Sequence, residues 1–328
     1  MTAPPRAREL DLGLLAEFDD MALRVFLDPS DRGVDPADLG AALRAAPDDL
    51  VTRTRDALPL AAQGDFDTAL RGRAGPADAA RARRRVIDLL FWPLVYWNFP
   101  DDYDELIAGD QLHPLVLDEL DLDGRVVCDI GAGSGRFTLA AAQRAQRVIA
   151  VDVVTPLLER LARRAQAAGI DNVEIRRGAF SALPVESASV DVAVACSSFT
   201  RRPPHGGDAA LAEAERIVKP GGDVVVIWPH EDAWLRSRGF TYIALRGNDS
   251  VRFRDVATAA RLCAAYYSAT AARWVRAHGS ATVPYRVLGV PPPNDLCVKR
   301  VPTPSRSPGT RGTRRTSAAF APPAPGSR

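Results

Sequence analysis

The chain has 328 residues, 46% of them hydrophobic and 25% charged, and its formal net charge at pH 7 is +1. A chain of this length forms one or two domains with a large buried core, and a charge balance near zero gives no electrostatic basis for binding nucleic acid. No apolar run approaches the roughly 20 residues that span a membrane, and the N-terminus lacks the apolar segment of a signal peptide. We therefore expect a cytoplasmic globular protein with neither a nucleic-acid nor a membrane partner.

The four cysteines are scattered and contain no C-x-x-C pair, which disfavours a disulfide scaffold and a zinc site. Three of them fall in or beside apolar stretches, where a buried free thiol is the ordinary state. We expect no metal site.

The N-terminal third is patterned for helices. Residues 1–8 are rich in proline and arginine, and we expect them to be flexible. Asp35 followed by Pro36 predicts a helix N-cap and a first helical residue, and residues 76–90 predict a further helix with one polar side. We expect residues 9–120 to form a helical cap; whether it is a lid or a dimer interface stays open, as does the oligomeric state.

Six aromatic residues fall between Phe91 and Tyr103. They have two interpretations: a core cluster that docks the helical region on the rest of the protein, which is the more common use, or a wall of the active site. In the second interpretation Tyr96, Trp97 and Tyr103 contact the substrate, because aromatic faces attract apolar and cationic ligands.

The stretch Val126–Phe137, VVCDIGAGSGRF, predicts a buried strand, a glycine-rich turn and the start of a helix. Glycines at 131, 133 and 135 suit a tight turn with positive φ and let a ligand approach the bare backbone. The helix start that follows offers unpaired N–H groups to such a ligand. A dinucleotide-binding turn has its third glycine five positions after the first; here that position is Arg136.

Two carboxylates end strand candidates. Asp129 ends the first strand, two residues before Gly131. A second apolar run, Val148–Val151, leads into Asp152, which lies 21 residues after Gly131 (152 − 131). A carboxylate there can accept both hydroxyls of a ribose, and this suits NAD and S-adenosylmethionine (SAM) alike.

Strands and helices alternate along the rest of this region. The expected strands are at residues 172–176, 191–195 and 224–228, and the expected helices are at residues 156–168 and 208–219. Thr155 as N-cap and Pro156 as first residue open the earlier of these helices. Such alternation predicts a parallel sheet with right-handed crossovers.

Four motifs occur in a characteristic order: D-x-G-x-G-x-G, the acid at 152, the segment LPVESASVD leading into a strand, and a helix followed by KPGG and another strand. This order resembles the class I SAM-dependent methyltransferases. The resemblance implies an α/β fold with a seven-stranded, mostly parallel Rossmann-like sheet, helices on both faces and an α-helical N-terminal cap. It also implies SAM as cofactor.

By the same resemblance, the cofactor is bound by Asp129, Gly131, Ala132, Gly133, Gly135, Asp152, Val153, Ala179, Phe180, Cys196 and Ser197. Asp152 would bind the ribose, and loop amides would lie near the methionine carboxylate. Many relatives carry a Gly-Asp pair after the third strand, where the acid binds adenine; here the pair is Gly178-Ala179. Adenine would then be held by backbone groups and by stacking on Phe180.

The C-terminal part is less regular. Residues 255–278 predict one long helix or two, inserted between strands. Residues 284–290 and 294–301 flank a Pro-Pro-Pro turn and look like the closing β-hairpin of the family's sheet. The SAM-binding domain is therefore expected at residues 121–301, and the composition of residues 302–328 predicts a disordered tail.

Methyl transfer needs chiefly the positioning of donor and acceptor, and a base where the acceptor carries a proton. His205 and His230 follow the fourth and fifth strands on the ligand-binding edge, and each is a base candidate, although an ordinary loop histidine is more common. Arg201 in the first of these loops is a candidate partner for an acidic substrate.

These features predict a SAM-dependent methyltransferase acting on a small molecule, and they leave the acceptor atom open between O, C and N. The alternative is a catalytically inactive SAM-fold protein that serves binding or assembly, which the missing adenine acid keeps open. A third hypothesis, an NAD-dependent oxidoreductase, is opposed by the glycine spacing.

Overall fold

The computed structural model describes residues 10–30, 33–73, 75–110, 112, 114–202, 206–247 and 249–303. The segment 1–8 and residues 304–328 of the expected tail lie outside this part. Within it, none of the helices combines the length and hydropathy of a membrane span. No group of three or more His, Cys, Asp and Glu side chains in the same ranges is arranged to hold a metal ion.

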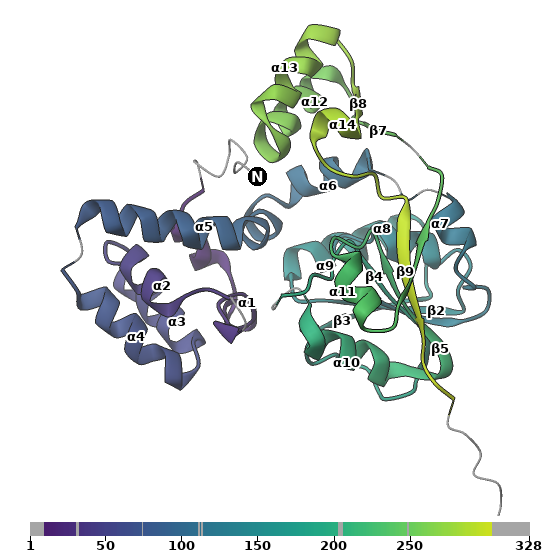
Figure 1. The fold of residues 1–328 in the computed structure, drawn as a ribbon, viewed down its shortest axis with the longest axis horizontal. Coiled ribbons are helices and arrows are strands. Elements are labelled where there is room, and N and C mark those ends of the chain that lie inside the picture. The colour runs from purple at the N-terminus through teal and green to yellow at the C-terminus, as the bar shows by residue number, and fades with distance from the viewer. Residues whose placement is uncertain are drawn as a thin grey trace, which may run out of the picture.

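A seven-stranded sheet forms the centre of the second half of the chain, in the order β3-β2-β1-β4-β5-β9-β6 (Figure 1). The first five strands in this order run parallel, and β9 is antiparallel to both of its neighbours. The strands are β1 (Val126–Ile130), β2 (Arg147–Asp152), β3 (Val173–Arg177), β4 (Val190–Cys196), β5 (Val218–Ile227), β6 (Thr241–Ala244) and β9 (Asp295–Arg300). The predicted mostly parallel, Rossmann-like sheet is confirmed.

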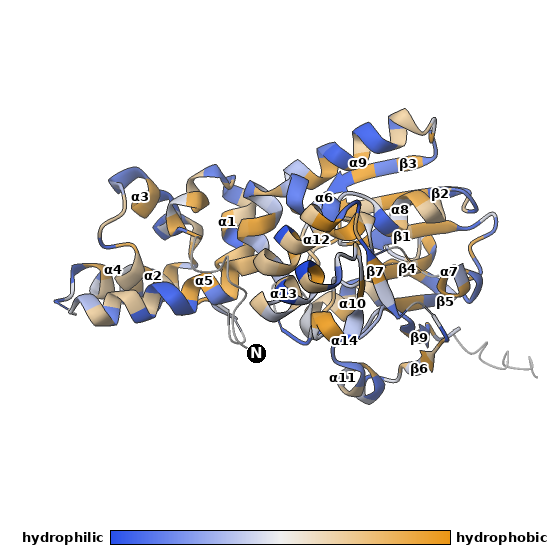
Figure 2. Ribbon diagram, turned by 90° about the horizontal axis from the view of Figure 1, so that it is seen from above, coloured by the Kyte–Doolittle hydropathy of each residue, from blue (hydrophilic) through white to orange (hydrophobic). Residues whose placement is uncertain are grey.

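Helices cover both faces of the sheet, as predicted. Successive strand residues point to opposite faces, so Val127 of β1 packs in one apolar cluster with Phe137 of α8, whereas Cys128 packs in another with Leu211 of α10. Along α9, hydrophobic and hydrophilic stretches alternate (Figure 2), as expected for a helix with one face on a sheet. The helices of this half are α7 (Pro114–Asp118), α8 (Arg136–Ala141), α9 (Thr155–Ala167), α10 (Gly207–Ile217) and α11 (Asp232–Ser237).

The N-terminal region is helical, as predicted. Its elements are the 3₁₀ helix η2 (Leu12–Glu17), α1 (Asp20–Phe26), α2 (Pro36–Ala42), α3 (Asp48–Ala57), α4 (Leu60–Arg71), α5 (Pro76–Asn98) and α6 (Pro100–Ala108). Asp35 is the N-cap of α2, where its Oδ1 accepts from the Ala37 N–H at 2.8 Å. α5 continues beyond its expected end at residue 90, because Leu94 and Trp97 extend its buried face.

The segment between β6 and β9 forms a small lobe, the insertion lobe (residues 249–290). Its elements are β7 (Ser250–Arg252), α12 (Val256–Leu262), a π-helical turn (Cys263–Tyr267), α13 (Ala269–His278), β8 (Thr282–Pro284) and α14 (Tyr285–Leu288). The lobe lies beyond α6 as seen from the sheet (Figure 1). Its buried residues share one apolar cluster with those of the N-terminal helices. The helical cover therefore consists of two segments far apart in the sequence.

Two local predictions are wrong. The expected closing hairpin is absent from the described residues, because 285–288 form a helical turn that ends at Gly289 (φ +78°), and β9 pairs with β5 and β6 instead. Thr155 is the first residue of α9 rather than its N-cap. The preceding residue, Val154, holds the cap position, because its N–H donates to Asp152 Oδ1 and turns the chain one residue earlier.

Candidate active site

The turn after β1 has the conformation that its three glycines allow. Gly131, Gly133 and Gly135 have φ of +80°, +54° and +96°, in the left-handed region that other residues rarely adopt. A Cβ on Gly135 would also lie 2.4 Å from Leu161 Cδ1 of α9. The third glycine therefore serves the packing of a helix against the turn.

Side chains from three distant segments surround the first two glycines. A Cβ on Gly131 would lie 2.5 Å from Ser198 Cβ and 2.9 Å from Phe180 Cζ. A Cβ on Gly133 would lie 3.2 Å from the hydroxyl oxygen of Tyr103, which comes from α6. Two residues singled out for different reasons, Phe180 for the cofactor and Tyr103 for the substrate, thus meet at the same turn.

The Asp152 carboxylate ties the end of β2 to the turn. Its Oδ2 accepts from the Gly133 N–H at 2.8 Å, and its Oδ1 accepts from the Val154 N–H at 2.9 Å. Burial raises the pKa of this carboxyl, and the amide bonds oppose the rise. Each oxygen keeps a further lone pair, so the carboxylate can still accept from a ligand.

The Asp129 carboxylate is only half satisfied. Asp129 is 1% exposed, and its Oδ2 accepts from the Thr138 hydroxyl. Its Oδ1 is buried and has no hydrogen-bond partner among the described residues. Burial raises the pKa of this carboxyl to about 7. A donor or a cationic group from a ligand would complete the site.

The amides of the turn are largely engaged within the fold. The N–H groups of Gly131 and Ala132 both donate to the carbonyl of Val151, at 2.8 and 3.1 Å, and that of Gly135 donates to the carbonyl of Ala132 at 2.9 Å. The Gly133 amide is bound as described above. A ligand carboxylate therefore needs a donor other than these four amides.

The segment expected to hold adenine has no acidic side chain. Val153 is buried after β2, and Ala179 occupies the position of the acid and bridges to Ala182. The Phe180 ring lies 5.4 Å from that of Phe199 at an interplanar angle of 48°. The surface at this end of the site is thus apolar.

The ends of β4 and β5 carry the polar groups of the opposite side. Cys196 ends β4, and Ser197 follows it with a φ of +55°. The hydroxyl of Ser197 lies 3.3 Å from His230 Nε2. His230 is exposed, and the desolvation that it does have lowers its pKa, which favours the neutral ring that can accept a proton.

The other polar candidates are less well placed or lie outside the described residues. Arg201 is exposed, and its backbone N–H donates to the Glu231 carboxylate. His205, the second base candidate, is outside the described residues.

The aromatic segment divides between core and site. Trp97 is buried in the N-terminal region, where it stacks on Phe18 at 4.9 Å and its Nε1–H donates to the Glu17 carbonyl at 2.6 Å. Tyr96 and Tyr103 contact each other edge to face at 5.0 Å, and burial raises the pKa of Tyr103 to about 12. Trp97 thus belongs to the core, whereas Tyr103 lies beside the glycine-rich turn; that Tyr96 and Tyr103 contact the substrate stays a prediction.

Sequence reasoning missed Arg136 as a site residue. Its side chain is 11% exposed, and its NH1 donates to Asp110 Oδ2 at 3.1 Å. The other oxygen of that carboxylate accepts from the hydroxyl of Tyr285, 175 residues away in the chain. In the sequence, the position of an arginine directly after the glycines was the available sign of this role. Its partners Asp110 and Tyr285 gave no further sign, because they lie far from it in the chain.

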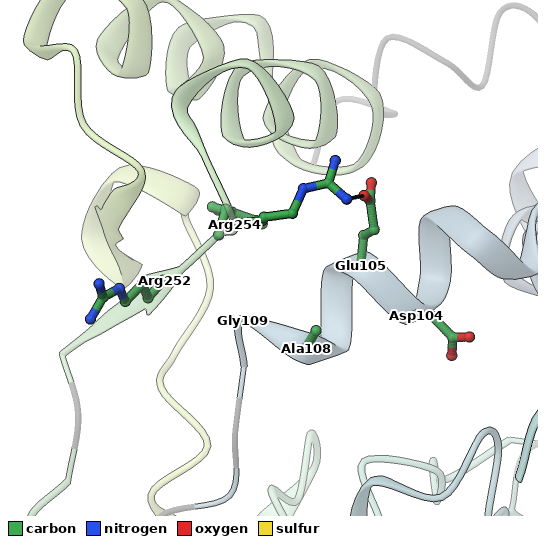
Figure 3. Close-up of a pocket in the computed structure, with 7 residues that line it drawn as sticks. Asp104, Glu105, Ala108, Gly109, Arg252 and Arg254 are labelled. Atoms are coloured by element: carbon green, nitrogen blue, oxygen red, sulfur yellow. Dashed lines mark ion pairs between the residues drawn. The ribbon is translucent and has the colours of Figure 1, made fainter. Parts of the chain in front are cut away.

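A separate cavity of about 480 Å³ lies between α6 and the start of the insertion lobe (Figure 3). Charged side chains line it, and Arg254 pairs with Glu105 across it at 2.8 Å. None of its lining residues belongs to the glycine-rich turn or to the strand ends of the sheet. The candidate site is therefore the cluster around the turn.

Comparison with known proteins agrees with this geometry. Residues 127–222 match the sequence profile of a family described as "Methyltransferase domain". The chain is 34% identical over 128 residues to YafE, an uncharacterized protein of Escherichia coli, in an alignment that covers 37% of this chain and 59% of YafE. It is 30% identical over 131 residues to the ubiquinone biosynthesis O-methyltransferase of Paracidovorax citrulli, covering 39% of this chain and 53% of that protein.

Among solved structures, YcgJ of Bacillus subtilis is 16% identical, with a TM-score of 0.41, and the match covers 58% of this chain and 97% of that one. The chain spans between half and three fifths of the length of the two curated relatives above.

The fold and the site define a class. An open sheet of this strand order, with a glycine-rich turn after β1 and a carboxylate at the end of β2, is a Rossmann-like core. Within that class, residues 127–222 match the model of a methyltransferase domain.

Proposed function

We propose that the protein is an enzyme that transfers a methyl group from SAM to a small-molecule acceptor. The observation that carries the proposal is Asp129 Oδ1, a buried carboxylate oxygen next to the glycine-rich turn with no partner among the described residues. A buried charge without a partner is costly, and a cationic ligand group would offset that cost. The methionine end of SAM carries such a group, an ammonium.

The other residues around the turn fit the rest of SAM. The two oxygens of Asp152 suit the two hydroxyls of a ribose. Val153 and Phe180 offer apolar surface to adenine. When bound, SAM supplies a methyl group activated by a positively charged sulfur. The protein's own task is to hold the acceptor in line with that group.

The acceptor belongs to the side of β4 and β5 in this proposal. Asp152 and Asp129 assign the donor to the ends of β2 and β1, and β4 and β5 are the next strands along the sheet. Tyr103 of α6 places its hydroxyl beside the turn, so a helix of the N-terminal region borders the site, which suits a small molecule better than a polymer. One relative is named for O-methylation in ubiquinone biosynthesis, which supports a small-molecule acceptor.

His230 is the proposed base. Its lowered pKa keeps the ring neutral at pH 7, and its Nε2 lies 3.3 Å from the Ser197 hydroxyl. A hydroxyl acceptor at the ends of β4 and β5 would lose its proton to Nε2 directly or through Ser197.

Ala179 supports a second candidate function, a protein of this fold that binds SAM without transferring its methyl group. The alanine gives the adenine amino group no acid to bind, which would weaken the hold on the donor. Turnover separates the two functions: an enzyme forms S-adenosylhomocysteine when supplied with acceptors, and a binding protein does not.

The first test is isothermal titration calorimetry with SAM, S-adenosylhomocysteine and NADH, using the wild type, Asp152→Asn and a control, Asp123→Asn. Asp123 lies in an exposed ion pair with Arg144. We expect both adenosyl ligands to bind and NADH not to bind. Loss of a hydrogen bond to a charged group costs about 1.5 to 3 kcal/mol, so Asp152→Asn should weaken binding by roughly 10- to 150-fold.

The control variant should bind as the wild type does, and thermal unfolding of each variant verifies its fold. Binding of NADH in place of the adenosyl ligands, or binding of none of the three, would contradict the proposal.

A further inference from the structure

A group of hydrogen-bond donors lies at the carboxyl ends of β4 and β5, beyond the strands assigned to the donor nucleoside. The Arg136 guanidinium approaches Cys196 Sγ with NH2 at 3.7 Å, and its Cζ lies 5.9 Å from the centre of the Trp228 ring. The Nε1–H of Trp228 is buried and has no hydrogen-bond partner among the described residues. A buried donor without a partner is costly, and the ring that carries it has the Arg136 guanidinium, a second donor group, over its face.

Trp228 is also held in an uncommon conformation. It follows β5 with a φ of +53°, in a region where few non-glycine residues are found. Its N–H donates to the carbonyl of Asp295 at 2.8 Å, which fixes the backbone. Strained residues of this kind cluster at functional sites, so the position of the indole is a candidate for a binding role.

Some N–H groups of the Arg136 guanidinium have strong acceptors and others do not. Its NH1 donates to Asp110 Oδ2 at 3.1 Å and to the Asp110 carbonyl at 3.3 Å. The Tyr285 hydroxyl donates to the same carboxylate and holds it from the insertion lobe. The Nε–H of Arg136 has no partner within the described ranges, so the guanidinium keeps donors for a ligand.

The surroundings supply few strong acceptors for these donors. The Cys196 thiol is a weak acceptor, and burial raises its pKa, which keeps it uncharged. A carboxylate has two oxygens in one plane, and it matches the two parallel N–H groups of a guanidinium. A third hydrogen bond from an indole N–H would satisfy a remaining lone pair.

We propose that Arg136 and Trp228 form a carboxylate-binding site at the ends of β4 and β5, with Asp110 and Tyr285 as positioning residues. The inference rests on the proposed function, because the carboxylate is either that of the methionine end of SAM or one carried by the acceptor. The chemistry at the site is the same in both cases.

The test uses the full-length protein and the variants Arg136→Gln, Arg136→Lys and Trp228→Phe. Arg238→Gln is the matched control, because Arg238 lies in an exposed ion pair with Asp208. Calorimetry compares SAM with decarboxylated SAM, which lacks only the carboxylate. In a second arm, protein saturated with S-adenosylhomocysteine is titrated with benzoate, phenylacetate and decanoate, and with the amide of each.

We expect the wild type to prefer the carboxylate by at least tenfold in one of the two arms, and that arm identifies its source. Arg136→Gln and Trp228→Phe should each reduce the preference at least fivefold, Arg136→Lys should retain part of it, and Arg238→Gln should retain all of it. The lysine and phenylalanine variants keep the test valid if the glutamine variant does not fold.

Two negative outcomes are distinct. If the wild type binds SAM but prefers the carboxylate in neither arm, or if the preference survives both Arg136→Gln and Trp228→Phe, the carboxylate site is refuted and the proposed function stands. If the wild type binds neither SAM nor S-adenosylhomocysteine, the proposed function is refuted, and the carboxylate site, which rests on it, is refuted as well.

Discussion

Replacing Asp129 by asparagine should make the free protein more stable at pH 8 and should weaken its binding of SAM. The carboxylate is 1% exposed, and its Oδ1 has no partner among the described residues. Asparagine has nearly the same shape and no charge. The substitution therefore removes a buried charge with little change in packing, and it also removes the group proposed to bind the ammonium of SAM.

The sign and size follow from proton linkage. Burial raises the pKa of Asp129 to about 7 in the folded chain, whereas an unfolded chain releases this proton near pH 3.9. Between these values the folded state holds more protons, so the free energy of unfolding of the wild type falls as pH rises from about 4 to 7. At pH 8 the charge costs on the order of 4 kcal/mol. The side-chain amide of asparagine is a buried polar group as well, and burying it costs about 1 to 3 kcal/mol. The substitution should therefore raise the free energy of unfolding at pH 8 by a net amount of about 1 to 3 kcal/mol.

Urea unfolding at pH 5 and pH 8 measures this directly. Asp129→Asn should unfold at a higher urea concentration than the wild type at pH 8, and the advantage should be absent at pH 5. Calorimetry should show SAM binding weakened at least tenfold. The exposed control Asp123→Asn should show neither effect. An Asp129→Asn protein that is less stable than the wild type at pH 8 and binds SAM normally would refute the reasoning.

Three further predictions concern the turn, the insertion lobe and the base. Gly135→Ala should destabilise the protein by about 2 kcal/mol more than Gly124→Ala in chemical denaturation, because both glycines have positive φ but only the first has no room for a Cβ. Tyr285→Phe should lower the free energy of unfolding by roughly 1 to 3 kcal/mol, and Tyr242→Phe, at an exposed hydrogen bond, by less. His230→Gln should lower kcat by about 10²- to 10⁴-fold. Because the pKa of His230 is lowered, the wild-type kcat should fall only at pH values below the ordinary titration range of histidine. If the pH profile of kcat is the same in His230→Gln as in the wild type, His230 is not the base.

The glycine-rich turn was predictable because its signals are local. A short β-branched run, three glycines and an alanine-rich stretch follow one another within Val126–Ala145, and each reports the backbone conformation of its own residues. Asp129 and Asp152 were singled out for the same reason, since Asp152 ends β2 and Asp129 is the residue before the end of β1; their part in ligand binding stays a prediction. The half-satisfied state of Asp129 was not predictable, because it depends on which side chains surround it.

The closing strands were harder to predict because strand pairing is not local. β9 takes one partner on each side, β5 and β6, which lie far back in the sequence. The apolar pattern of residues 284–290 fits a strand as well as the helical turn that forms, since a short apolar run does not distinguish the two. Periodicity also gave no indication that the insertion lobe packs with the N-terminal helices.

The cluster around Arg136 shows the same limit at the candidate site. Asp110 follows α6 and Tyr285 belongs to the insertion lobe, and because they are 175 residues apart no spacing rule joins them. Trp228 was expected within a strand and instead follows β5 with positive φ. These contacts exist only after the two covering segments have packed against the sheet.

The most direct test of the central claim, that the turn with Asp129 and Asp152 holds SAM, is a crystal structure with S-adenosylhomocysteine bound. The account predicts the ligand's ammonium within hydrogen-bond distance of Asp129 Oδ1 and its ribose hydroxyls on the Asp152 carboxylate. A ligand bound elsewhere, or bound at the turn with Asp129 Oδ1 still lacking a partner, would contradict it.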